Sequence, residues 1–508
     1  MRLTSFVTQS QTPPAAASEE PLPWAALFSL CLGFFMILVD LTIVSVATPT
    51  IVKSLHTTNN AVIWVTSAYA LAYAVPVLIT GRLGDRFGAR KLYLIGLTVF
   101  TLSSLWCGLT NSIGELIIAR VVQGLGAAIM TPQTMATIAR IFPAHARGRA
   151  MAVWGATSGV SMVVGPVLGG VLTTWLGWEW IFFINVPFGV LGFWLAMRNV
   201  PVLETHGHKF DWLGVALSGV GMFFLVFGIQ EGHQKHWATW IVTMIIAGIV
   251  FLALFLGWQR FNRNEPLVPL GLFKDRNYSI ANIIITTMGF AFTGFGFPLI
   301  FYCQEVRGDS SIQAALFLVP MAVMTLLLAK FAGDLTDKLH PRWVVGFGLA
   351  CGSGAVFWLS ATLSPGEHVW QLVLPMLLLG VGSAFIWAPN TATATRNLPM
   401  TQAGAGSGVY NATRQVGGAV GSAAMAVLID SRLAALIPGA SSSGSGDGST
   451  QLPQQLWEPF SKAMSQSMLL PAIAVAIGLL AALAYQRPSH AGFGGPAAAQ
   501  PEAAPAAH

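Results

Sequence analysis

Three ionisable residues, Asp40, Arg120 and Arg414, stand inside long apolar stretches of the sequence. An ionisable side chain at the centre of a membrane costs about 2.5–3.5 kcal/mol on insertion scales and usually faces a partner or a cavity. Asp40 is about eight residues and Arg120 about seven residues from the outer end of its stretch, so at about 1.5 Å per residue both are expected at one depth. A carboxylate and a guanidinium at one depth can pair, and protonation of Asp40 would release Arg120. This chemistry suits proton coupling; the alternative is a static ion pair that ties two helices together.

Arg414 is predicted to contact substrate or a gate, with Asn411 and Gln415 nearby on the same helix; the alternative is helix packing. Most aromatic residues are expected to face lipid or the membrane interface. Four further polar or aromatic side chains are candidates for lining a substrate cavity: Trp64, Tyr69, Tyr73 and Gln123.

Several chemistries have no pattern in the sequence. The ten histidines show no paired metal-ligand spacing, and no phosphate-binding Gly-x-x-x-x-Gly-Lys-[Ser/Thr] loop is present. We therefore expect neither an enzyme nor a metal site, and no cofactor. Energy is expected from the proton motive force or another gradient.

The composition is that of a membrane protein. Hydrophobic residues make up 54% of the 508 residues and charged residues 9%, against about 25% charged in a typical soluble domain. A soluble enzyme and a disordered chain are therefore excluded. The four cysteines all fall within apolar runs and are expected to act as small hydrophobic residues.

About 20 mostly apolar residues are needed for a helix to cross the hydrocarbon core. The apolar runs are continuous rather than alternating, which predicts an all-α integral membrane protein with fourteen transmembrane helices instead of a β-barrel. The expected spans are 24–48, 62–81, 91–110, 113–139, 149–174, 180–198, 212–229, 239–259, 279–303, 312–332, 343–363, 369–389, 405–429 and 467–485.

The basic residues indicate the orientation. With a cytoplasmic N-terminus, 18 of the 26 lysines and arginines fall in cytoplasmic segments and five in outer segments. The chain is therefore expected to be a multi-pass protein of the cell membrane with both termini in the cytoplasm.

An internal repeat divides the chain. Gly81-x-Leu-x-Asp85-Arg86 is matched, at an offset of 252 residues, by Gly333-x-Leu-x-Asp337-Lys338, and Arg90 by Arg342. We expect each motif to form a conformational latch, with Asp85 and Asp337 pairing with neighbouring helix ends; the alternative is an ordinary basic loop.

The repeat predicts two pseudo-symmetric six-helix bundles with two extra central helices. The expected units are a cytoplasmic segment (1–23), an N-terminal bundle (24–198), two additional helices with linkers (199–278), a C-terminal bundle (279–486) and a disordered cytoplasmic tail (487–508).

A glycine-rich stretch lies in the fifth span: Gly165, Pro166, Gly169 and Gly170. Glycines at this spacing let helices approach closely, and proline bends a helix. Tight packing at the glycines with bending near Pro166 is expected.

Four motifs together resemble the major facilitator superfamily, and more narrowly its fourteen-helix drug:proton antiporter branch. They are the loop signature Gly81–Lys91, the span 4 signature Arg120–Gly126, the span 5 antiporter signature Gly165–Gly170 and the span 1 signature Leu38–Val44. Two positions depart from the pattern: Ser45 stands where Asn is common and Glu179 where Arg is common.

The resemblance implies a proton-coupled exporter of amphipathic, often cationic small molecules that works by alternating access. The alternatives are a dedicated exporter of an endogenous metabolite, siderophore or lipid and, less favoured, a non-transporting membrane sensor or scaffold. The expected partners are a small-molecule substrate, protons and the lipid bilayer, with no nucleic acid; a monomer is compatible with the sequence.

Overall fold

The computed structural model describes residues 22–57, 59–143, 146–205, 211–232, 235, 237–262, 266–437 and 452–487. Across these residues the regular structure is entirely helical. Thirteen helices are long and apolar enough to cross a membrane, and one bent pair of helices brings the number to fourteen. The predicted all-helical membrane fold is confirmed. Of the predicted cytoplasmic segment 1–23 and tail 487–508, residues 1–21 and 488–508 lie outside the described residues.

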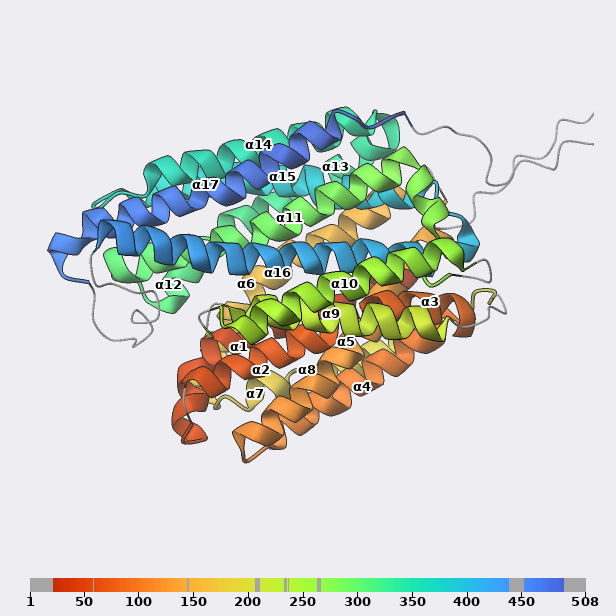
Figure 1. Ribbon diagram of the computed structural model, residues 1–508, viewed down its shortest axis with the longest axis horizontal. Coiled ribbons are helices and arrows are strands. Elements are labelled where there is room, and N and C mark those ends of the chain that lie inside the picture. The colour runs from red at the N-terminus through yellow and green to blue at the C-terminus, as the bar shows by residue number, and fades with distance from the viewer. Residues whose placement is uncertain are drawn as a thin grey trace, which may run out of the picture.

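The N-terminal half contains the first six spans. It occupies the lower part of Figure 1, coloured red to yellow. Its helices are α1 (Trp24–Ser54), α2 (Asn59–Ala74), α3 (Val77–Phe87), α4 (Ala89–Leu109), α5 (Ile113–Ile141), α6 (Arg147–Trp175), α7 (Trp180–Phe183) and α8 (Asn185–Asn199).

Two additional helices follow, α9 (Trp212–Gly232) and α10 (Thr239–Phe261). They form an antiparallel hairpin that runs between the two halves in Figure 1. Of the two, α9 packs on α2 and on a helix of the C-terminal half, whereas α10 packs mainly on α9 and exposes an apolar face suited to lipid. A short 3₁₀ turn, Leu270–Lys274, leads into the second half.

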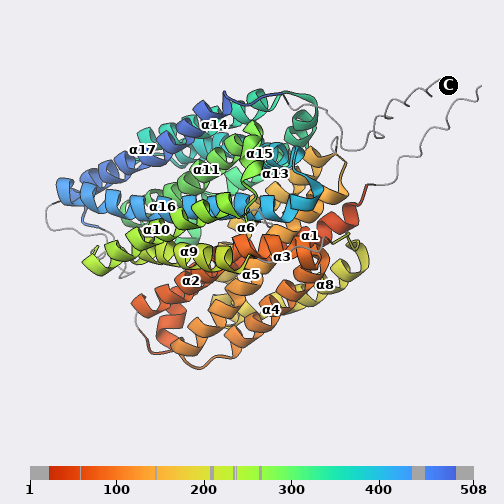
Figure 2. The same ribbon diagram turned by 45° about the vertical axis from the view of Figure 1, so that its right-hand side comes forward.

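The C-terminal half forms the upper, green to blue part of Figure 1 and is seen from another side in Figure 2. Its helices are α11 (Arg276–Phe301, continued by a π-helical turn to Val306), α12 (Ser311–Leu316), α13 (Val319–Lys338), α14 (Pro341–Thr362), α15 (Val369–Arg396), α16 (Ala403–Leu436) and α17 (Trp457–Ala482). Both helices extend beyond the predicted spans 405–429 and 467–485, because α16 continues to Leu436 and α17 already begins at Trp457.

Equivalent helices pack in equivalent ways in the two halves. In the N-terminal half α1 packs on α6 and α4 on α5, while in the C-terminal half α11 packs on α16 and α14 on α15. The two halves meet along a boundary that we call the seam. Across it α3 packs on α16 and α13 packs on α6. The 252-residue repeat thus corresponds to a repeat of helix packing.

Two local features differ from the sequence expectation. The second span is bent by 45° between α2 and α3, where Pro76 precedes α3. The motif that starts at Gly81, predicted as a loop, is helical up to Phe87, and Gly88 ends the helix with a φ of +93°. Gly333 to Lys338 is likewise the last part of α13. The loop predicted from Gly81 is therefore wrong up to Phe87, because the helix extends beyond its apolar stretch.

Candidate functional site

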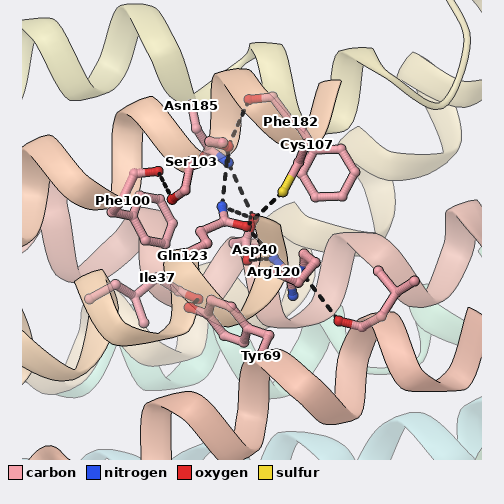
Figure 3. Close-up of polar contacts among 12 residues, drawn as sticks. Ile37, Asp40, Tyr69, Phe100, Ser103, Cys107, Arg120, Gln123, Phe182 and Asn185 are labelled. Carbon is pink, nitrogen blue, oxygen red and sulfur yellow. Dashed lines mark hydrogen bonds and ion pairs between the residues drawn. The ribbon is translucent and has the colours of Figure 1, made fainter. Parts of the chain in front are cut away.

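Asp40 and Arg120 form an ion pair whose two side chains are fully buried. Asp40 comes from the middle of α1 and Arg120 from the N-terminal part of α5, and the predicted pairing is confirmed. The carboxylate also accepts hydrogen bonds from Gln123 (2.9 Å) and Asn185 (3.3 Å). Figure 3 shows these donors converging on Asp40. Hydrogen-bonded partners of opposite charge offset the cost of burying a carboxylate.

Arg120 is held from several directions. Its Nε donates to the backbone oxygen of Val65 at 3.1 Å and its Nη1 to Gln123 at 2.7 Å. The guanidinium carbon lies 4.0 Å from the centre of the Tyr69 ring, close enough for a cation–π interaction. Its Nη2 is buried with no hydrogen-bond partner among the described residues. Among the described residues, Asp40 is therefore the only ionic partner of this guanidinium.

Gln123 and Tyr69 are both fully buried members of this network. Gln123 bridges the pair, because its amide donates to Asp40 and to Ser104 while its oxygen accepts from Arg120. The Tyr69 hydroxyl donates to the backbone of α1 at Ile37. The structure thus places both residues in the carboxylate network of the N-terminal half, and their predicted role in lining a substrate cavity stays a prediction.

Asn185 and Ser104 belong to the network but were not among the predicted site residues, and neither was Cys107, whose thiol donates to Gln123 Oε1 at 3.6 Å. Asn185, at the start of α8, donates to Asp40 and to Ser104, and Ser104 on α4 donates to the backbone oxygen of Phe182. Neither is charged, so a search for ionisable residues passes over them. An amide inside the apolar run 180–198 was the available signal.

The Asp85 carboxylate caps a helix of the other half. It accepts from the backbone N–H groups of Gly404 (2.8 Å) and Ala405 (2.9 Å), in the first turn of α16. A carboxylate at a helix N-terminus satisfies unpaired N–H groups and meets the positive end of the helix dipole. Arg82, one turn earlier on α3, lies 3.8 Å from the same carboxylate.

Asp337 makes the equivalent contact in the opposite direction. Its carboxylate accepts from the backbone N–H of Gly148 at 3.0 Å, in the first turn of α6. Beside it Arg149 and Asp334 form a more exposed ion pair at 2.6 Å. Both predicted contacts between an aspartate and a neighbouring helix end are therefore present, and each of them joins the two halves.

The other predicted latch residues pack near these helix caps or bind within their own half. A Cβ atom on Gly81 would lie 2.9 Å from Gly408 Cα, and one on Gly333 would lie 3.0 Å from the backbone of Gly148, so both positions need the small residue. Arg90 donates to Met197 at the end of α8, and Arg342 to Tyr485 beyond α17. These two bind within their own halves. Arg86 lies 5.1 Å from the Phe87 ring.

The glycine-rich face of α6 packs against α1. A Cβ on Gly165 would meet Thr42, and one on Gly169 would lie 3.0 Å from Ile43, so the predicted close approach is present. Gly170 is buried, and its carbonyl accepts from Thr174 at 2.6 Å. The helix continues through Pro166 from Arg147 to Trp175.

Three of the other predicted cavity residues, Arg414, Tyr73 and Asn411, lie on the seam between the halves. Arg414 on α16 donates from Nη2 to the Tyr73 hydroxyl on α2 at 3.3 Å. Asn411 is fully buried against Met135, with its amide donating to Ser407. Gln415 is half-buried on the same helix. Trp64 stands apart from them, with its ring centre 5.8 Å from that of Phe227 on α9.

A membrane-embedded pair of six-helix halves joined by reciprocal contacts is the architecture of a secondary transporter. Comparisons agree: the family model described as Major Facilitator Superfamily matches residues 30–422. The chain belongs to the major facilitator superfamily, and it is a transporter rather than an enzyme.

Individual proteins of known sequence or structure are also similar to this chain. An uncharacterized transporter of this type from Mycobacterium tuberculosis is 52% identical over 91% of this chain and 80% of its own length. The tetracenomycin C resistance and export protein of Streptomyces glaucescens is 31% identical over 85% of this chain and 81% of its own. The crystal structure of the human organic anion transporter MFSD10 covers 90% of this chain and 100% of its own, with a TM-score of 0.61 at 15% identity, and shows the shared fold.

Proposed function

We propose that this transporter is a proton-coupled exporter of amphipathic small molecules, driven by the proton motive force and working by alternating access in the cell membrane. The observation that carries the proposal is the fully buried pair of Asp40 and Arg120. Under this proposal Asp40 exchanges the proton and Arg120 responds to its charge. Both termini lie in the cytoplasm, as the distribution of basic residues favours.

Protonation of Asp40 removes the negative charge that compensates Arg120 in this network. A neutral Asp40 no longer compensates Arg120, and an uncompensated charge in an apolar interior costs several kcal/mol. The guanidinium then gains by moving toward water or another acceptor. Movement past the Tyr69 ring, which the guanidinium contacts, is the expected direction, because Nη2 has no hydrogen-bond partner among the residues that the structure describes.

The helix that carries Asp40 also contacts the helix that is capped from the other half. Thr42 and Ile43, next to Asp40 on α1, pack against the glycine face of α6. The N-terminus of α6 is in turn bound by Asp337. A displacement of α1 is therefore expected to change the position of α6 and to weaken the Asp337 contact.

Asp85 and Asp337 close one end of the seam in this conformation. We place that end in the cytoplasm, because the basic residues around both motifs follow the positive-inside rule. Opening toward the cytoplasm would break both helix caps and expose their N–H groups to water. Cargo loading is proposed to occur in that opened state.

The direction of transport rests on the resemblance of Gly165 to Gly170 to the exporter signature and on the relatives. One relative exports tetracenomycin C, according to its name. Because that name specifies a single natural product, the alternative is a dedicated exporter of one endogenous metabolite, siderophore or lipid. A non-transporting sensor or scaffold is the third hypothesis.

The test uses purified protein in proteoliposomes with a pH-sensitive dye inside. A pH gradient is imposed, and rhodamine B, its methyl ester and ethidium are added in turn while proton counter-movement is recorded. The proposal expects at least one of them to move against protons, and the Asp40→Asn variant to lose this coupling. Asp334→Asn, a more exposed carboxylate, is the matched control and retains it.

Three outcomes would go against the proposal. If Asp40→Asn transports as well as the parent with the same proton stoichiometry, Asp40 is not the proton site. If no compound of any class, natural products and lipids included, produces flux, the sensor or scaffold hypothesis is favoured. Flux with only one endogenous compound would favour the dedicated exporter.

A further inference from the structure

Arg414 carries a positive charge in the middle of the membrane. It lies eleven residues beyond the start of α16 at Ala403, which at about 1.5 Å per residue is about 16 Å along a span of about 30 Å. Its hydrogen bond to Tyr73 crosses the seam between the halves. It therefore stands where a transporter with two repeated halves binds its cargo.

Asp40 does not neutralise this charge. Its carboxylate is bonded to Arg120, Gln123 and Asn185, all within the N-terminal half. Because the side chain is also fully buried, no face of it is open toward the seam. The negative charge near the centre is thus already compensated, whereas the charge of Arg414 is not.

Four other carboxylates on α16's neighbouring helices lie near helix ends. Asp85 caps the N-terminus of α16, Glu115 accepts from Trp106, and Glu231 interacts with Lys235. Glu458 is exposed in the first turn of α17. Among the described residues, no acidic side chain within ion-pair distance of Arg414 is present.

Hydrogen-bonding capacity around Arg414 is also unused. Its Nε is buried with no acceptor among the described residues, although Nη2 reaches Tyr73. Asn411, three residues before Arg414, lies on the same helix surface, since residues three or four apart are neighbours there. A buried guanidinium donor without an acceptor costs free energy that a carboxylate ligand would recover in a bidentate contact.

We infer that Arg414 binds an acidic group of the cargo, so the transported molecules are amphipathic compounds that carry a carboxylate or a comparable acidic group. This inference rests on the proposed function, because it assigns a ligand to the transporter's seam. It differs from the cationic cargo that the family resemblance implies. A preference for cations would be favoured by a free carboxylate at the centre, and Asp40 is occupied by Arg120.

The test compares two dyes that differ only at one group. Rhodamine B has a free carboxylate, and in its methyl ester that carboxylate is blocked, while the cationic ring system is the same. Binding to purified protein in lipid nanodiscs is measured by fluorescence anisotropy without any pH gradient. Wild-type protein is expected to bind rhodamine B about 10-fold to 100-fold more tightly than the ester, the range for one charge-assisted contact.

Variants assign this preference to one side chain. In Arg414→Gln the preference for rhodamine B is expected to disappear, while binding of the ester is retained and shows that the protein is folded. Arg414→Lys keeps the charge and is expected to keep part of the preference. Arg432→Gln is the matched control on the same helix, because Arg432 is exposed near its outer end, and it should bind as wild type does.

Three results would overturn the inference: equal affinity of wild type for the two dyes, an undiminished preference in Arg414→Gln, or no binding of rhodamine B or of any other carboxylated dye. Because binding is measured without a gradient, these results are independent of proton coupling. If the protein exports the ester against protons but binds the two dyes with equal affinity, this inference is wrong and the proposed function is unaffected.

Discussion

Asp85 and Asp337 occupy equivalent positions in the two repeats, and each caps the first turn of a helix that belongs to the opposite half. The two contacts are reciprocal: α3 holds α16, and α13 holds α6. A pair of contacts related in this way closes one end of the seam on both sides. Separation of the halves at that end therefore has to break both of them.

Removal of the Asp85 charge is expected to favour opening of the closed end. Asp85→Asn keeps the shape but loses most of the favourable interaction with the α16 dipole, which at about 1 kcal/mol corresponds to a population shift of about fivefold. Single-molecule FRET between dyes on the two halves would measure this shift. The matched control is Asp334→Asn, whose more exposed ion pair should contribute little. An unchanged distribution in Asp85→Asn would contradict the latch.

A methyl group at Gly81 should have the same effect by a steric route. In Gly81→Ala the added Cβ would meet the backbone of Gly404 and Gly408, neither of which has a flexible side chain to move away. Overpacking of this kind costs about 1–3 kcal/mol, so the closed population is expected to fall. Gly354→Ala, which adds a Cβ in open space, is the control. Equal FRET distributions in the two variants would be inconsistent with the close approach.

Arg120 and Asp40 should be strongly coupled in stability. Arg120→Gln leaves the Asp40 carboxylate buried without its ionic partner, and breaking a buried pair in this way costs about 3–5 kcal/mol. The double variant with Asp40→Asn removes both charges and is expected to recover much of that loss. Thermal unfolding of all four proteins in one detergent gives the coupling. Strictly additive losses would show that the pair is not an energetic unit.

The carboxyl of Asp211, directly before α9, is expected to make the free energy of unfolding depend on pH. Burial raises the pKa of this carboxyl, but hydrogen bonds from Trp258, Gln259, Gly214 and Leu267 outweigh it, so its pKa is lowered overall. A carboxyl with a lowered folded pKa stabilises the protein above its unfolded pKa of about 3.9, and this contribution is lost as the pH falls through the folded pKa.

The stability difference between wild type and Asp211→Asn should therefore be constant near neutral pH and shrink below about pH 4. Chemical unfolding at several pH values measures it. Glu204→Gln alters an exposed carboxylate on the same connection and serves as the control. A difference that grows toward acid would contradict the assignment.

The sequence could predict the helical class, the repeat and the charged pair, because each depends on composition or periodicity. Asp40 and Arg120 were found by depth along their helices, and the Asp85 and Asp337 contacts by the repeat. Asn185 and Ser104 could not be found in this way, since neutral polar residues inside spans give no signal of their partner. The contact between Arg414 and Tyr73 depends on how the halves meet, which single-helix patterns do not contain.

The most direct test of the account is proton release on cargo binding. Purified protein in a weakly buffered solution with a pH indicator is mixed with whichever dye gave the largest flux in proteoliposomes. Wild-type protein is expected to release protons when the dye binds, and Asp40→Asn is expected to bind the dye without releasing them. Equal proton release by wild type and Asp40→Asn would contradict the central claim that Asp40 exchanges the transported proton.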